Sequence, residues 1–170
     1  MEHSEATKSV ENAAVFFVGN QLMLDDGIGH AAYEEFQRVF YVPRGVDLFD
    51  VGCMTMDMIS YVRDYDFVMT VDAVEDSGEP AGTVFRYAPD DVARAGMIAS
   101  LHDLKLANLF DAAALLGYES IGLCLGMQVL NCEPDEYIVG LTEPCAEKLP
   151  LLVETIAAEL HKQGFNIERR

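Results

Sequence analysis

The sequence predicts an α/β fold: a mostly parallel, twisted sheet with helices on both faces, in one domain. Short continuous apolar runs, such as "AAVFFV" (13–18), suit buried parallel strands, which are covered on both faces. These runs alternate with longer segments whose apolar residues have helical spacing, and that alternation is typical of a parallel sheet. A chain of 170 residues with 51% hydrophobic content is long enough for one full core and too short for two ordinary domains.

The N-terminal half is predicted to contain three strands and two helices. Each strand is an apolar run rich in β-branched or aromatic residues, and the first one ends at Gly19. In the first helix, Ile28, Ala32 and Phe36 recur at helical spacing. The expected elements are, in chain order, strand 13–18, helix 28–40, strand 46–52, helix 56–65 and strand 66–74.

The C-terminal half begins with a Pro/Gly turn and an edge strand within 78–87. An apolar-periodic helix over 100–118 closes at Gly117, and a buried strand follows over 120–129. The last helix, 142–164, opens with Thr-Glu-Pro and ends in Lys162 and Gly164, as helices commonly do. We expect a domain over 13–164, with an N-terminal extension at 1–12 and a C-terminal tail at 165–170.

Composition limits the classes of partner. Eleven Lys and Arg against 29 Asp and Glu give a formal net charge of −18, which disfavours nucleic acid and anionic membrane surfaces. No apolar run is long enough to cross a bilayer, and the polar N-terminus lacks the apolar core of a signal peptide. The four cysteines form no C-x-x-C pair. We therefore expect a cytoplasmic protein with reduced cysteines.

The loop after the first strand allows two opposite interpretations. Gly27, Gly29 and Ala32 have the spacing of a dinucleotide-binding turn, and Asp50 lies near where a ribose-binding acid would stand. However, that motif should follow the strand directly, and the adjacent pair Asp25 and Asp26 would repel a pyrophosphate. The other interpretation is a carboxylate site for a cation.

Several of these polar residues are expected to meet at one edge of the sheet. Asp26, Asp50 and Asp72 follow strands, and His102 stands at a helix start, so all should lie near the carboxyl ends of the strands. Two carboxylates and an imidazole (Asp26, Asp72 and His102) suit a borderline ion such as Ni²⁺ or Zn²⁺. Each residue also has a structural alternative: Asp25 or Asp26 as a helix N-cap, Asp72 closing a turn, and His102 stacking at a helix start.

The motifs "GNQLMLDDGIG", "VDAV", "PAGTV" and "SLHDLKLANLFDAAALLG" occur in an order and spacing that resemble the hydrogenase maturation endopeptidases. The resemblance runs from about Ala14 to about Leu160. It implies a five-stranded, three-layer α/β/α fold of the phosphorylase/hydrolase-like kind. It also implies that a C-terminal extension is cleaved from the large-subunit precursor of a [NiFe] hydrogenase once nickel is in place. The family's three metal-reaching residues correspond to Asp26, Asp72 and His102.

Three positions depart from the family pattern. Phe17 stands where the family usually has glycine, and Cys53 takes the threonine position of an Asp-x-Gly-Thr segment. The later "GMQVLN" lacks the usual Pro-Glu. Asp26, Asp72 and His102, the metal-reaching residues, are all intact. The departures lie elsewhere, so we expect them to affect how the substrate docks.

The resemblance favours a peptidase that borrows nickel from its substrate and needs no permanent cofactor. Asp26 or Asp72 would act as general base on a water while the cation polarises the scissile carbonyl. Asp50 would orient a ligand or shape the cleft, or serve as a cap. Two alternatives remain at this point: a non-catalytic module of the same fold that binds the nickel-loaded precursor, and a dinucleotide-binding protein.

Overall fold

The computed structural model describes residues 9–53, 58–89, 91 and 109–170. It confirms the predicted α/β class, with a five-stranded sheet in the order β3-β1-β4-β6-β5. Strands β3, β1, β4 and β6 run parallel, and β5 is an antiparallel edge strand. The named elements are β1 (Ala13–Val18), η1 (Leu24–Gly27), α1 (Ile28–Val39), β2 (Phe40–Tyr41), β3 (Val46–Gly52), α2 (Ile59–Asp64), β4 (Phe67–Val74), β5 (Val84–Tyr87), β6 (Ile121–Gln128), α5 (Glu143–Lys162) and β7 (Glu168–Arg169).

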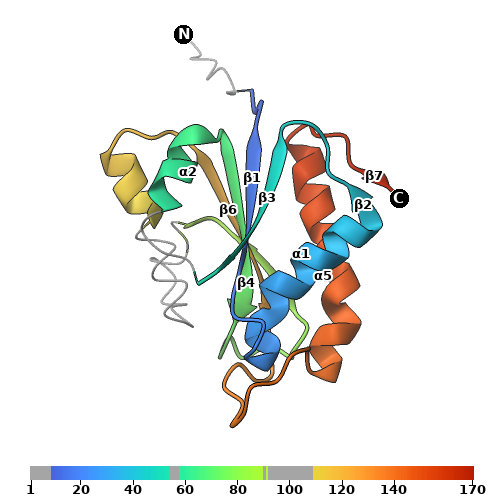
Figure 1. Ribbon diagram of the computed structural model, residues 1–170. Coiled ribbons are helices and arrows are strands. Elements are labelled where there is room, and N and C mark those ends of the chain that lie inside the picture. Colours follow the sequence, from blue (N-terminus) through green and yellow to red (C-terminus); the bar gives the residue numbers. More distant parts are fainter. Residues whose placement is uncertain (1–8, 54–57, 90, 92–108) are drawn as a thin grey trace.

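Helices cover both faces of the sheet, as Figure 1 shows. Helices α1 and α5 pack together on one face, where the larger core includes Phe36, Leu152 and Ile156. Helix α2 and the helical segment 109–115 cover the other face. Strands β1 and β4 are buried along their whole length, as the continuous apolar runs predict for central parallel strands.

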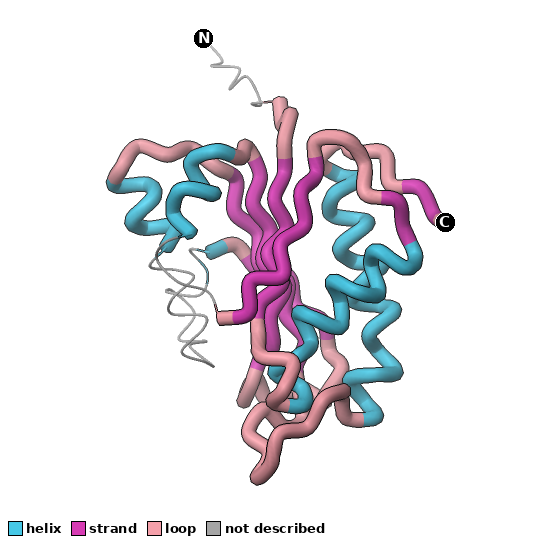
Figure 2. The backbone as a smooth tube through the Cα atoms, viewed as in Figure 1, coloured by secondary structure: helices cyan, strands magenta, loops and turns pink. Residues whose placement is uncertain are grey.

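The predicted elements agree with the structure except at a few places. The short helix η1 was not predicted from the sequence, and neither were the two-residue strands β2 and β7, which pair antiparallel beside the main sheet. In Figure 2 these two strands lie next to the C-terminus. Of the helix predicted over 100–118, residues 109–115 are helical, and 100–108 lie outside the described residues. Within the described ranges, no helix is both long and apolar enough to span a membrane.

The carboxyl ends of the parallel strands meet at one edge of the sheet. Strand β1 leads there into η1 and α1, and η1 packs against β4. Loop 129–142, which joins β6 to α5, lies at the same edge (Figure 1). Ligands of parallel sheets bind at this edge, so the loop after β1 and its neighbours form the candidate site.

Candidate active site

The glycines around the first loop are required by close backbone packing. Gly19 has a φ of 125°, and a Cβ there would lie 1.8 Å from the carbonyl oxygen of Asp26. A Cβ on Gly29 would lie 2.1 Å from the carbonyl oxygen of Val18, at the point where α1 crosses β1. This packing accounts for the glycine spacing without a nucleotide, which removes the main support for the dinucleotide interpretation.

Asp26 is held in place through one of its two carboxylate oxygens. Its Oδ2 accepts a hydrogen bond from the Asn20 N–H at 2.8 Å, within the loop that β1 leads into. The side chain is half-buried, and Oδ1 has no hydrogen-bond partner among the described residues. One oxygen therefore orients the carboxylate, and the other is available to a ligand or a water.

Asp72 lies on β4, next to β1 in the sheet. The residue is only 6% exposed, and its Oδ1 accepts a hydrogen bond from the Ala73 N–H at 2.7 Å. Asp72 was predicted to lie at the end of its strand, but β4 continues for two more residues, to Val74. Asp72 therefore lies on a strand of the sheet, whereas Asp26 lies in the short helix η1 that follows β1.

Cys132 lies on loop 129–142, which Asp25 holds beside the loop after β1. Burial raises the pKa of Cys132, and the negative charges of Glu75, Asp26, Asp25 and Asp72 raise it further. These negative charges come from η1, from β4 and from the residue that follows β4. Negative charge at this end of the sheet favours a positively charged ligand over an anion.

The third predicted ligand, His102, lies outside the described residues. Within the described ranges, no group of three or more His, Cys, Asp or Glu residues is placed to hold a metal ion. The structure thus brings Asp26 and Asp72 to the same end of the sheet, and the complete trio stays a prediction.

Asp25 has a different role from Asp26. Its side chain is fully buried, and its Oδ2 accepts hydrogen bonds from the N–H groups of Leu130 and Asn131, both at 3.0 Å. The Thr142 N–H donates to Oδ1 at 2.7 Å, and the Thr142 hydroxyl also donates to the carboxylate. Asp25 therefore fastens loop 129–142 to the loop after β1.

The N-cap alternative for Asp25 and Asp26 is wrong. The residue before α1 is Gly27, and no side chain caps that helix. The first turn of α1 is instead covered by the preceding helix η1, which leads directly into it. Both carboxylates are used elsewhere, Asp25 on loop 129–142 and Asp26 on Asn20.

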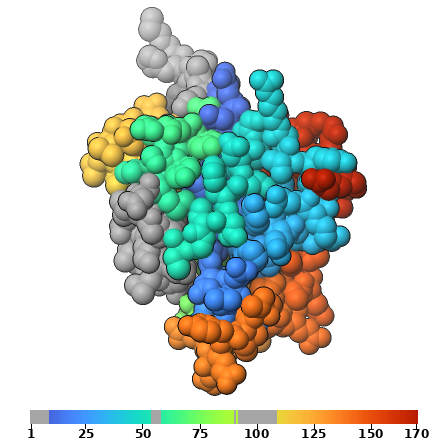
Figure 3. All heavy atoms as spheres, in the orientation of Figure 1, coloured from blue at the N-terminus to red at the C-terminus, as the bar shows by residue number. Residues whose placement is uncertain are grey.

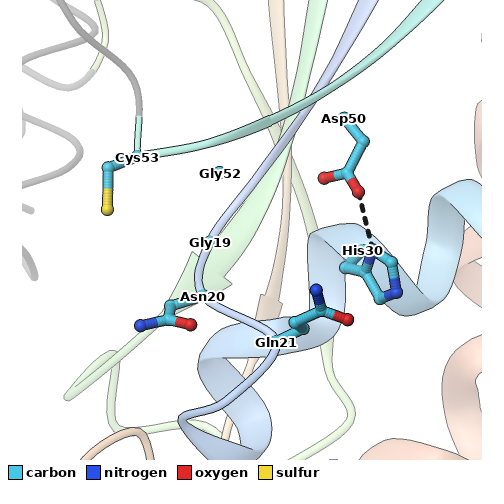
Figure 4. Close-up of a pocket in the computed structure, with 7 residues that line it drawn as sticks. All are labelled: Gly19, Asn20, Gln21, His30, Asp50, Gly52 and Cys53. Carbon is cyan, nitrogen blue, oxygen red and sulfur yellow. Dashed lines mark hydrogen bonds and ion pairs between the residues drawn. The ribbon is translucent and has the colours of Figure 1, made fainter.

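A pocket of about 320 Å³ adjoins the Asp26 loop, with which it shares Gly19, Asn20 and Gln21. Figure 4 shows the His30 and Asp50 side chains next to each other, joined by a hydrogen bond, while the Cys53 side chain points away from them. The His30 Nδ1 lies 2.6 Å from Asp50 Oδ2. The full lining is Gly19, Asn20, Gln21, His30, Asp50, Gly52 and Cys53.

His30 was not among the site residues predicted from the sequence. Its ring is held on two sides, because Nε2 lies 3.6 Å from Glu34 Oε1, one helical turn away. Asp50 lies within β3, two residues before the strand ends at Gly52. The pair therefore joins the first turns of α1 to the end of β3, and it orients the Asp50 carboxylate toward the pocket. A signal was present: a histidine directly after Gly29, at a helix start that faces the expected site.

This chain is similar in sequence to proteins of hydrogenase maturation. The hydrogenase expression/formation protein HupD of Thiocapsa roseopersicina is 31% identical over 159 residues, which cover 92% of this chain and 71% of that protein. The hydrogenase 2 maturation protease of Escherichia coli is 26% identical over 152 residues, covering 88% of this chain and 91% of that protein.

Solved structures share the fold. The hydrogenase maturating endopeptidase HybD from Escherichia coli matches with a TM-score of 0.82 at 23% identity, covering 94% of this chain and 98% of that one. The [NiFe] hydrogenase maturation protease HycI from Thermococcus kodakarensis matches with a TM-score of 0.70 at 20% identity, covering 89% and 93% of the two chains. The family model described as HycI, hydrogenase maturation protease, matches residues 31–159. This chain is therefore a peptidase that belongs to the hydrogenase maturation protease family.

Proposed function

We propose that this peptidase removes a C-terminal extension from the large-subunit precursor of a [NiFe] hydrogenase after nickel has been inserted. The family assignment supports a substrate from hydrogenase maturation. The placement of Asp26 and Asp72 at one end of the sheet is the structural observation that carries the proposal.

In this proposal, the substrate's nickel is the recognition element. Asp26, Asp72 and His102 approach the ion from the peptidase side, with the part of His102 resting on the sequence resemblance alone. Two carboxylates and one imidazole make an incomplete shell, which should hold a free ion weakly. The same three groups can bind tightly to an ion whose remaining ligands come from the precursor. Cleavage then occurs only after metal insertion.

The proposed chemistry is the attack of an activated water on the scissile carbonyl. Either Asp26 or Asp72 takes the proton of that water as general base, and the nickel polarises the carbonyl oxygen. The oxygen Oδ1 of Asp26 is suited to this step because Oδ2 already accepts the Asn20 N–H. The nearby Asp50, oriented by His30, shapes the pocket beside the reaction.

The proposal is tested by supplying nickel in two different ways. In one arm, chelator-treated enzyme is mixed with nickel-loaded precursor; in the other, nickel-free precursor is mixed with enzyme and added Ni²⁺ or Zn²⁺. The mass of the precursor is followed by mass spectrometry. We expect shortening in the first arm alone. Rapid cleavage in the second arm, while the precursor's own metal site stays empty, would indicate an ordinary metalloprotease instead.

A further inference from the structure

Loop 129–142 exposes several large apolar side chains beside the candidate site. Leu130 is 65% exposed, Tyr137 79% and Val139 72%. Single exposed apolar residues are ordinary, but several on one short loop mark a surface that binds another protein. In Figure 3 the orange atoms of this loop project at the lower end of the molecule, below the blue atoms of the loop after β1.

Backbone hydrogen bonds attach loop 129–142 to the loop that carries Asp26. The Ile138 N–H donates to the Leu22 carbonyl, and the Leu24 N–H donates to the Ile138 carbonyl, both at 2.9 Å. Leu22 and Ile138 are themselves exposed, each at 43%. The apolar surface therefore continues from loop 129–142 onto the segment that leads to Asp26.

The charge on this loop has one sign. Glu133, Asp135 and Glu136 are all exposed, and the sequence has no Lys or Arg between residues 129 and 142. A partner with acidic side chains around its apolar contacts would be repelled here. A partner with Lys or Arg around its apolar contacts would be attracted.

We propose that loop 129–142, together with Leu22, is the docking surface for the hydrogenase precursor. It binds a part of that partner in which apolar side chains are flanked by Lys or Arg. This inference rests on the proposed function, which supplies the partner. Because Asp25 and the backbone hydrogen bonds fix the loop against the Asp26 segment, docking here also places the bound chain beside the reacting carboxylates.

The apolar part of the inference is tested with the double substitution Tyr137→Ser and Val139→Ser. The matched control is Leu115→Ser with Leu116→Ser. These leucines are 89% and 59% exposed near the helical segment 109–115, at the other end of the molecule (Figure 1). We expect the loop variant to raise the KM for nickel-loaded precursor about tenfold or more, with kcat nearly unchanged. The control should leave both constants as they are. Thermal unfolding of each variant checks that the fold is retained.

The charged part is tested with Glu136→Lys against Asp111→Lys, which changes the net charge equally at an exposed position on segment 109–115. Added salt should raise the KM of the wild-type protein, because it screens attraction between opposite charges. We expect Glu136→Lys to raise the KM several-fold at low salt and to weaken the salt dependence. Asp111→Lys should do neither.

Docking and cleavage are separated by measuring both. If the wild-type protein shortens the precursor and the loop variants keep its KM, the docking inference is wrong and the proposed function stands. If the wild-type protein binds the precursor without shortening it, and Tyr137→Ser with Val139→Ser abolishes that binding, the docking surface is supported and the proposed cleavage is wrong. Absence of binding by the wild-type protein would overturn both.

Discussion

Asp25 and Thr142, which are 117 residues apart in the chain, are joined by both donors of the threonine. The Thr142 N–H reaches Asp25 Oδ1 at 2.7 Å, and its hydroxyl reaches Oδ2 at 2.7 Å. Thr142 is the residue immediately before α5, so a buried carboxylate stands at the N-terminus of that helix, where the helix dipole favours negative charge. One side chain therefore stabilises a helix start and fixes the position of loop 129–142.

We predict that Asp25→Asn destabilises the protein by about 2–4 kcal/mol, because an amide turns an NH₂ group toward N–H and O–H donors that the carboxylate now accepts. The free energy of unfolding, from denaturant titration, measures this loss. Thr142→Val removes only the hydroxyl donor and should cost about 1 kcal/mol. Equal stability of Asp25→Asn and the wild-type protein would mean that the loop is held by other contacts.

Asp26→Asn is predicted to have the opposite effect from its neighbour. The amide keeps the shape of the side chain, and its oxygen can still accept the single hydrogen bond from Asn20, so the stability should change little. It loses the charge that attracts a cation and the basicity that activates water. Processing of nickel-loaded precursor, followed by mass, should stop. Normal processing by the folded variant would remove Asp26 from the mechanism.

The contrast between these two acids shows where sequence reasoning stops. Adjacent carboxylates look equivalent in "LDDGIG", and their roles are decided by what each one meets across the fold. Asp25 meets loop 129–142, which is more than a hundred residues away, and no local pattern predicts that contact. The resemblance to the family selected Asp26, and the structure supplies the physical difference between them.

The strands and long helices were predictable because their signals are local and repeated. Continuous apolar runs gave β1, β4 and β6 to within one or two residues. The pair β2 and β7 has two residues in each strand, too few for any periodicity, and is specified only by its tertiary contact.

Phe17, which stands where the family usually has glycine, is fully buried, and the centre of its ring lies 5.4 Å from that of Tyr33. The departure at Phe17 is therefore a feature of the packed core of this chain.

The pair His30 and Asp50 is predicted to support processing without contributing much to stability. Asp50→Asn keeps an oxygen that can accept from His30 but removes the negative charge beside the ring and the pocket, so we expect kcat/KM to fall about tenfold. His30→Gln keeps a side chain that can donate to Asp50, and it should lower kcat/KM less. Both variants should unfold close to the wild-type midpoint. Full activity of Asp50→Asn would show that the pocket is only a surface feature.

The four cysteines are predicted to react with iodoacetamide at very different rates. Cys53 is exposed, whereas Cys124 and Cys145 are buried, and the raised pKa of Cys132 disfavours its reactive thiolate. Peptide mass mapping after brief labelling of the folded protein should find the label on Cys53. Cys53→Thr should abolish rapid labelling and leave processing intact, because the family commonly has threonine there. Loss of processing without loss of stability would mean that this thiol contacts the substrate.

Glu159 forms a buried charge cluster on α5, away from the candidate site. Its Oε1 lies 2.6 Å from Lys162 Nζ and 3.1 Å from Arg86 Nε. Burial raises the pKa of Glu159, but the hydrogen bonds and positive charges of Lys162 and Arg86 lower it by more, so the pKa lies below its ordinary value of 4.5. The folded state therefore binds the Glu159 proton less readily than the unfolded state does.

The sign of the resulting pH dependence follows from that lowered pKa. A carboxylate whose pKa is lower in the folded state stabilises the fold above its unfolded pKa, and this stabilisation is lost as the pH falls through the folded pKa. Glu159→Gln should therefore cost about 1–2 kcal/mol at neutral pH, since both cations are partly solvated. The difference from the wild-type protein should shrink as the pH is lowered below 4.5.

The matched control is Glu154→Gln, which breaks an exposed pair with Arg169 and should cost little at any pH. Denaturant unfolding of the three proteins at several pH values measures these differences, and a Glu159→Gln cost that is the same at acidic and neutral pH would contradict the ionic origin of the stabilisation.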